Sequence, residues 1–133
     1  MMKLGNISEP RVTVDAESHK RLSLLAEASH LLDPDLADML LDELARAEVV
    51  DRLPEKTVGM GLAVEFKDHG TARHHKIELV YPSEANIEEG KVSIFTPIGV
   101  ALLGLQVGSA ITFLGKRDEQ RTVEVLDVTR KGE

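Results

Sequence analysis

The sequence predicts an α+β fold, in which an N-terminal helical hairpin precedes an antiparallel sheet domain that carries one short helix. Three observations predict it. Apolar residues recur at helical spacing up to about residue 50, and they alternate with a period of two after Pro54. A cap-plus-proline pair, Thr96-Pro97, then interrupts the alternation. We therefore expect a short helical hairpin over residues 12–52 and a sheet domain over residues 55–131.

The first helix is predicted from the apolar spacing that follows Asp15. Thr13 or Asp15 supplies a side-chain oxygen that can cap the first turn by accepting a hydrogen bond from an otherwise unpaired amide. Charged residues occupy the other faces. The apolar face is expected to consist of residues at 3-4-3 spacing, namely Leu22, Leu25, Ser29 and Leu32.

The second helix is predicted to begin at Asp33-Pro34. Aspartate is a preferred cap, and proline at the first helical position loses no hydrogen bond because its amide would be unpaired anyway. Asp35 and Asp38 then lie near the positive end of the helix dipole. The apolar stripe is Leu36, Leu40, Leu44 and Ala47. The short link predicts an antiparallel hairpin, or short coiled coil, with arms of about 17 residues and roughly 25 Å.

The second half of the chain is expected to contain five strands and one short helix. Proline, glycine and charged clusters separate the alternating segments, as is typical of strands joined by turns. The short helix is expected over residues 96–104, because a cap and a proline open it and a glycine ends it. The strands are expected near residues 58–66, 75–81, 92–95, 111–114 and 123–128.

Composition limits the function. The formal net charge is −7, and the aromatic residues are three phenylalanines and one tyrosine. Such a chain is poorly suited to neutralising phosphates or stacking on bases, so a protein partner is favoured over nucleic acid. There is no cysteine, no apolar N-terminal segment and no apolar run near the roughly 20 residues of a membrane span. These features predict a cytoplasmic protein without a membrane association.

One segment resembles a known family. Residues 95–108, FTPIGVALLGLQVG, resemble the S-P-(I/M)-(A/G)-x-A-L-(I/L)-G-x-x-V-G signature in the C-terminal domain of Gre-type transcription elongation factors. Residues 58–66 and 78–82 look like the first two strands of that domain, so the resemblance covers about residues 55–129. Within this group the L-V-Y-P strand ending and the truncated hairpin are similar to the regulator of nucleoside diphosphate kinase (Rnk) proteins.

The resemblance implies an FKBP-like C-terminal domain that docks on the rim of the RNA polymerase secondary channel. It places the docking role on Thr96, Pro97, Ile98, Gly99 and Ala101. In cleavage factors a longer hairpin carries acidic residues that help to position a catalytic Mg²⁺. The short hairpin here implies a non-enzymatic regulator, without a cofactor, that competes with longer Gre-like factors. The family's acidic residue after Val-Gly is replaced by Ser109, and its Pro-Gly-Gly turn is missing from residues 115–120.

Other interpretations of single features stay open. The hairpin tip residues Asp33, Asp35 and Asp38 are suited to Mg²⁺, although helix capping explains them more simply. A true cleavage factor would use that tip. Adjacent His74 and His75 point to opposite strand faces, so with His69 they favour surface histidines over a metal site. A peptidyl-prolyl isomerase and a regulator of nucleoside diphosphate kinase levels are further alternatives, and the chain is expected to be a monomer or a weak dimer.

Overall fold

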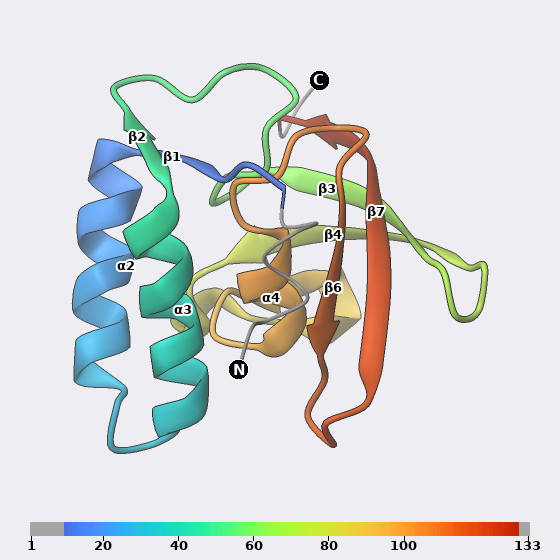
Figure 1. The fold of residues 1–133 in the computed structure, drawn as a ribbon. Coiled ribbons are helices and arrows are strands. Elements are labelled where there is room, and N and C mark those ends of the chain that lie inside the picture. The colour runs from blue at the N-terminus through green and yellow to red at the C-terminus, as the bar shows by residue number, and fades with distance from the viewer. Residues whose placement is uncertain (1–9, 131–133) are drawn as a thin grey trace.

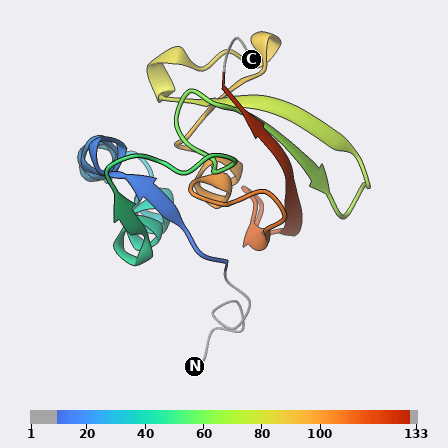
Figure 2. The same ribbon diagram turned by 90° about the horizontal axis from the view of Figure 1, so that it is seen from above.

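The computed structural model describes residues 10–130, which form a helical hairpin packed beside a sheet domain (Figures 1 and 2). Residues 1–9 and 131–133 lie outside this range, and residue 131 is the expected end of the second domain. In chain order the elements are β1 (Thr13–Asp15), α2 (Ala16–Ala28), α3 (Pro34–Arg46), β2 (Glu48–Val50), β3 (Ala63–Asp68), β4 (His74–Val80), the 3-10 turns η1 (Pro82–Glu84) and η2 (Ile87–Glu89), β5 (Lys91–Ser93), α4 (Pro97–Leu102), β6 (Ala110–Leu114) and β7 (Gln120–Thr129).

The hairpin has the predicted caps but shorter arms. Asp15 accepts a hydrogen bond from the Ser18 amide, and Asp33 accepts one from the Leu36 amide, so both helices begin as predicted. Each helix has 13 residues, which corresponds to about 20 Å rather than the expected 25 Å. The first helix ends at Ala28, so Leu32 lies on the connecting turn and is exposed, contrary to the predicted apolar face.

A short parallel pair of strands closes the base of the hairpin. β1 enters the first helix and β2 leaves the second, and the two pair in parallel from Thr13 with Glu48 to Asp15 with Val50. The sequence did not predict these strands, because three residues are too few to show a period. The Thr13 amide also donates to the Gly104 carbonyl at 3.0 Å, which joins the hairpin base to the sheet domain.

Five of the described strands form the sheet of the second domain, in the order β5-β4-β3-β7-β6. All neighbours are antiparallel except β4 and β5, which pair in parallel, so the sheet is mostly antiparallel, as expected, with one parallel pair at its edge. The first predicted strand also begins later, at Ala63 instead of Val58. Residues 60 and 61 form a turn instead, with Gly61 and Leu62 bonded to Leu79 of β4. The Val58 amide and carbonyl bond to Leu105 and Gly104 in the segment after α4.

One apolar core joins the hairpin to the sheet. α4 lies between them in Figures 1 and 2, so that its residues contact both α3 and β6. Buried members of the same core come from each part, including Leu22 and Leu40 from the hairpin, Leu102 from α4, and Val64 and Val123 from the sheet. None of the helices among residues 10–130 has the length and apolar character that crossing a membrane requires.

Candidate functional site

An open groove lies where the N-terminus of α4 faces the β6–β7 turn. One wall comes from η2, β5 and the start of α4, and the other comes from the β6–β7 turn and the beginning of β7. The lining residues are Ala85, Ile87, Lys91, Val92, Ser93, Thr96, Pro97, Ile98, Gly115, Lys116, Arg117, Glu119 and Arg121. The groove therefore combines an apolar floor with charged borders, which suits a protein surface.

The wall containing Pro97 is fixed by hydrogen bonds that the chain makes to itself. The Thr96 hydroxyl donates to the Ser93 carbonyl at 2.7 Å and accepts from the Gly99 amide at 3.1 Å. The Ser93 hydroxyl accepts from the Phe95 amide at 3.0 Å. Thr96 is thus occupied as the cap of α4, as predicted, and its hydroxyl holds Pro97 and the helix start against the groove.

Gly99 and Ala101 lie beneath this surface rather than on it. Ala101 is 2% exposed, and Gly99 is also buried. A Cβ at Gly99 would lie 2.5 Å from the Ser93 carbonyl oxygen, so the backbone before α4 passes directly over this position. These two residues have almost no surface to offer a partner, which leaves Thr96, Pro97 and Ile98 as the exposed part of the expected docking segment.

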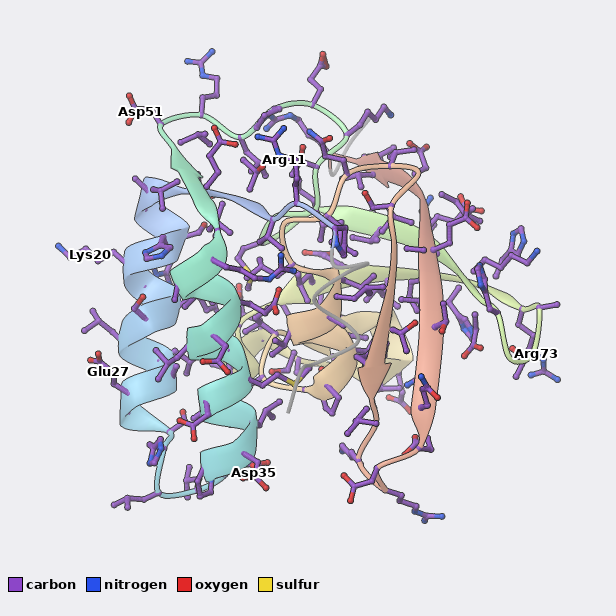
Figure 3. The ribbon with its side chains drawn as sticks, viewed as in Figure 1. Arg11, Lys20, Glu27, Asp35, Asp51 and Arg73 are labelled. Carbon is purple, nitrogen blue, oxygen red and sulfur yellow. The ribbon has the colours of Figure 1, made fainter. Side chains whose placement is uncertain are left out.

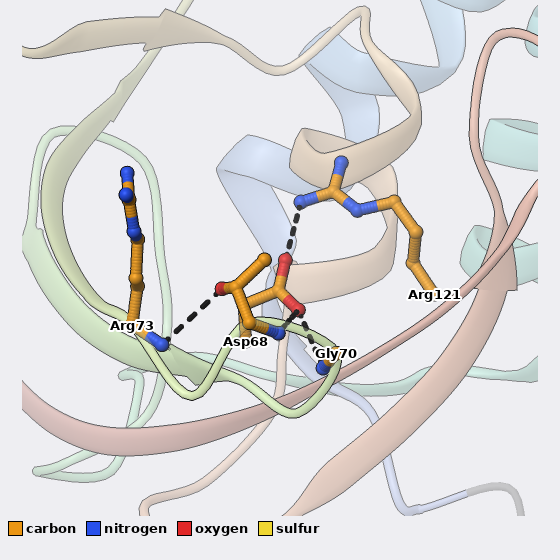
Figure 4. Close-up of polar contacts among 5 residues, drawn as sticks. Asp68, Gly70, Arg73 and Arg121 are labelled. Carbon is orange, nitrogen blue, oxygen red and sulfur yellow. Dashed lines mark hydrogen bonds and ion pairs between the residues drawn. The ribbon is translucent and has the colours of Figure 1, made fainter.

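Arg121 on β7 forms the opposite wall and is held by two side chains. It stands across the β6–β7 ladder from Phe113, and its guanidinium carbon lies 5.4 Å from the centre of that ring. Its Nη2 also lies 3.3 Å from the Asp68 carboxylate at the end of β3 (Figure 4). Stacking and ion pairing together hold the cation at the groove.

Asp68 is itself tied into the turn that follows β3. Its carboxylate accepts hydrogen bonds from the amides of Gly70 and Thr71 at 2.8 and 3.3 Å (Figure 4). Burial acts to raise the pKa of Asp68, but these backbone bonds and the Arg121 guanidinium outweigh it, so the pKa lies below its usual value. The carboxylate therefore stabilises the fold in its ionised form.

We expect Asp68→Asn to be destabilising at neutral pH and clearly less so in acid. A carboxyl with a lowered folded pKa stabilises the protein above its unfolded pKa of about 3.9, and that contribution disappears as the pH falls through the folded value. Urea unfolding of both proteins at pH 7 and near pH 3 measures this. Asp127 and Glu119 also have lowered pKa values, but they titrate in both proteins and cancel in the difference. A difference that did not change with pH would contradict the assignment.

The charge around the groove is opposite to that of the whole chain. Four cationic side chains and one carboxylate, Lys91, Lys116, Arg117, Arg121 and Glu119, line it, although the chain as a whole carries a net charge of −7. Lys91 is paired with Glu89, 3.3 Å away, and Arg121 with Asp68, so Lys116 and Arg117 supply most of the remaining positive charge. The groove is thus suited to an apolar surface with carboxylates at its border.

The three acidic residues at the hairpin tip each have a different environment. The Asp33 carboxylate caps α3, and Asp38 lies 3.1 Å from the His30 ring. Asp35 is exposed in the first turn of α3. The three carboxylates therefore do not converge, and among residues 10–130 no cluster of three or more histidines and carboxylates is arranged to hold a metal ion.

The three histidines of the β3–β4 hairpin each have a different neighbour. His69 lies 3.2 Å from the Glu124 carboxylate, and His74 lies 3.9 Å from that of Glu65. The His75 ring stacks on Phe66 with 5.2 Å between ring centres. The structure places them as separate surface side chains, which is the arrangement that the strand alternation favoured.

The sequence indicated the start of α4 as part of a surface, but it did not identify the other residues that line the groove. Lys116 and Arg117 are adjacent cations in an acidic chain, which was the available signal. Arg121 and Lys91 had no such signal, because their position depends on which strands pair. Ile87, which is 87% exposed, also borders the groove and follows no strand or helix period.

The fold and the groove together define a two-part binding module, made of a helical hairpin and an FKBP-like sheet domain whose groove suits another protein. Residues 53–130 match the family model for the C-terminal domain of the transcription elongation factors GreA and GreB, and residues 10–50 match the model of the Rnk N-terminus. The chain belongs to the GreA/GreB family and combines its C-terminal domain with an Rnk-type N-terminal hairpin.

Individual relatives agree with this assignment. The transcription elongation factor GreA of Thermodesulfovibrio yellowstonii is 32% identical over 80% of this chain and 68% of its own length. The regulator of nucleoside diphosphate kinase of Escherichia coli is 30% identical over 79% of each chain. A solved GreA/GreB elongation factor from Nitrosomonas europaea is 34% identical, covers 91% of this chain and 99% of its own, and superposes with a TM-score of 0.71.

Proposed function

We propose that this protein is a transcription regulator that docks its groove on RNA polymerase at the rim of the secondary channel. It thereby competes with longer Gre-like factors and has no transcript cleavage activity. The observation that carries the proposal is the groove itself, in which an apolar floor beside Pro97 and Ile98 is bordered by cations on an otherwise acidic chain. Membership of the GreA/GreB family supports the polymerase as the partner.

The short hairpin supports the absence of cleavage. Each arm is about 20 Å long, and its base is joined to the sheet domain through β1 and the Gly104 carbonyl. Asp33 is used as a helix cap and Asp38 lies beside His30, so two of the three tip carboxylates already have partners within the hairpin.

The test is a competition on stalled elongation complexes. Core RNA polymerase carrying backtracked RNA is incubated with a full-length GreA factor and increasing amounts of this protein. We expect displacement of the GreA factor, with the loss of its RNA shortening, and no shortening by this protein alone. Shortened RNA with this protein alone would establish a cleavage factor instead. Absence of binding at micromolar concentrations would exclude the polymerase as the partner.

A further inference from the structure

The outer edge of β6 lacks the features that usually protect the edge strand of a sheet. β6 has the sequence AITFL, without a charged residue or a proline, and it is the last strand of the sheet on its side. The strand at the opposite edge, β5, has three residues and begins with Lys91, whose amide and carbonyl both bond to Asn86. Natural proteins use short strands, lysines and covering segments to keep an edge from pairing with another chain. The edge of β6 is therefore open to such pairing, whereas that of β5 is protected.

Thr112 and Leu114 turn their backbone polar groups away from β7. The Val125 amide donates to the Ser109 carbonyl, and the two strands pair from there without a register shift. Residues of an antiparallel strand face their partner strand alternately, so the odd-numbered residues of β6 bond to β7 and the even-numbered ones point outward. Among residues 10–130 the amides and carbonyls of Thr112 and Leu114 have no hydrogen-bond partner. They are free to bond to an added strand.

A groove of about 580 Å³ runs along this edge, between β6 and α3. The lining includes residues 111–114 of β6 together with Met39, Asp42 and Arg46 of α3. Figure 1 shows α4 between these two elements. Because successive side chains of a strand point to opposite faces, a groove that contacts four successive residues follows the backbone edge. It shares no lining residue with the groove beside Pro97, so the two surfaces are separate.

One carboxylate in this edge groove has no counter-charge. Arg46 is bonded to Glu43 through Nε and Nη2, at 3.1 and 2.9 Å, so these two charges cancel. Asp42 is exposed and has no ion-pair partner in the described part of the chain. A lysine or arginine of a ligand would therefore be attracted to Asp42. A second copy of this protein would instead bring a β6 strand without cations and a second Asp42, on a chain of net charge −7, and would be repelled.

We propose that the edge of β6 binds an extended segment of another protein, which adds a sixth strand to the five-stranded sheet. Main-chain bonds to Thr112 and Leu114 hold the segment, and its alternate side chains select it. Those that face the groove are apolar, apart from one lysine or arginine beside Asp42. This inference does not rest on the proposed function, since the edge groove and the groove beside Pro97 can be occupied at the same time.

The test is an NMR titration of the full chain with the heptapeptide TVTKTVT, whose valines and lysine share one face of a strand, and with its glutamate counterpart TVTETVT. With the lysine peptide we expect the amide signals of Thr112 and Leu114 to shift and their hydrogen exchange to slow, because both amides gain a hydrogen bond. The lysine peptide is expected to bind about fivefold more tightly than the glutamate peptide, as one exposed ion pair replaces one like-charge contact.

Two variants separate the charge from the main-chain contact. Asp42→Lys is expected to reverse the preference between the peptides. Glu27→Lys is the matched control, because Glu27 projects from α2 away from the sheet (Figure 3), and it is expected to keep the preference. Thr112→Pro is expected to weaken the lysine peptide about tenfold, because one outward donor is lost. The bonds to β7 stay, since an edge strand tolerates proline where the amide faces solvent.

Three results would overturn the inference. Amides of Thr112 and Leu114 that neither shift nor gain protection at millimolar peptide would exclude strand addition at this edge. A preference for lysine that persists in Asp42→Lys would show that Asp42 does not select the ligand. A dimer of the unaltered protein in sedimentation, dissociated by Thr112→Pro, would identify a second copy as the occupant. Each result leaves the proposed function untouched, because the two grooves share no lining residue.

Discussion

Gly99→Ala is expected to lower the free energy of unfolding by about 2 kcal/mol, although alanine is the better helix former. The new Cβ would lie 2.5 Å from the Ser93 carbonyl oxygen and 2.8 Å from that of Ile94. Both atoms belong to the backbone, so the segment before α4 must move. Overpacking costs about 1–3 kcal/mol, and three backbone atoms within 2.9 Å of the new Cβ place Gly99 at the upper end of that range. The gain in helix propensity, at most roughly 1 kcal/mol, offsets only part of it.

Gly59→Ala is the matched control. Its Cβ would also meet an atom at 2.5 Å, but that atom is Cδ2 of Leu53, the end of a flexible side chain that can rotate away. We expect a loss below about 1 kcal/mol there, because the obstruction relaxes without backbone movement. Urea unfolding at constant m value measures both variants. Equal losses would show that the close backbone approach at Gly99 is not what restricts the position.

The close packing at Gly99 helps to define the shape of the proposed docking surface at the start of α4. Sequence resemblance gives Gly99 and Thr96 the same docking role, yet the structure separates them. Thr96 and Gly99 hold the start of α4 tightly against the turn from Ser93, and Pro97 and Ile98 are the side chains presented to the groove. A sequence motif therefore includes buried residues that hold a surface in place as well as the exposed residues that make up that surface.

Local signals in the sequence predicted the elements, and long-range pairing decided where several of them end. The caps at Asp15, Asp33 and Thr96 were predictable because each depends on a bond to an amide three residues away. Residues 58–66 alternate like one strand, but only the part from Ala63 belongs to β3, whereas Val58 bonds to the loop after α4. A period of two indicates an extended segment with one buried side, but it does not show which segment of the chain pairs with it.

The wall of the groove that β7 provides could not be predicted either, because it also depends on long-range strand pairing. Arg121 reaches the groove because β7 lies between β3 and β6, which brings it to Asp68 and Phe113 at once. Those residues are 53 and 8 positions away in sequence, and no local pattern links them. The helical spacing wrongly included Leu32, because the apolar pattern continued past residue 28, where α2 ends.

Pro97→Glu is expected to weaken binding to core RNA polymerase about thirtyfold, which corresponds to about 2 kcal/mol and the lower limit of an interface hot spot. The substitution suits the fold, because the first position of a helix needs no amide partner and its positive end favours a carboxylate. It introduces a negative charge into a groove whose cations, by our proposal, face carboxylates of the partner. The loss therefore combines removal of an apolar contact with charge repulsion.

Pro54→Glu provides the same chemical change at an exposed proline outside the groove, so its affinity should remain that of the unaltered protein. A second variant, Lys116→Glu with Arg117→Glu, reverses two exposed charges on the β6–β7 turn and leaves α4 untouched. If Pro97→Glu acts by misfolding α4, only that variant loses affinity. If the groove is the docking site, both variants lose it while Pro54→Glu does not. Equal weakening by all three would mean that net charge, rather than the groove, governs the association.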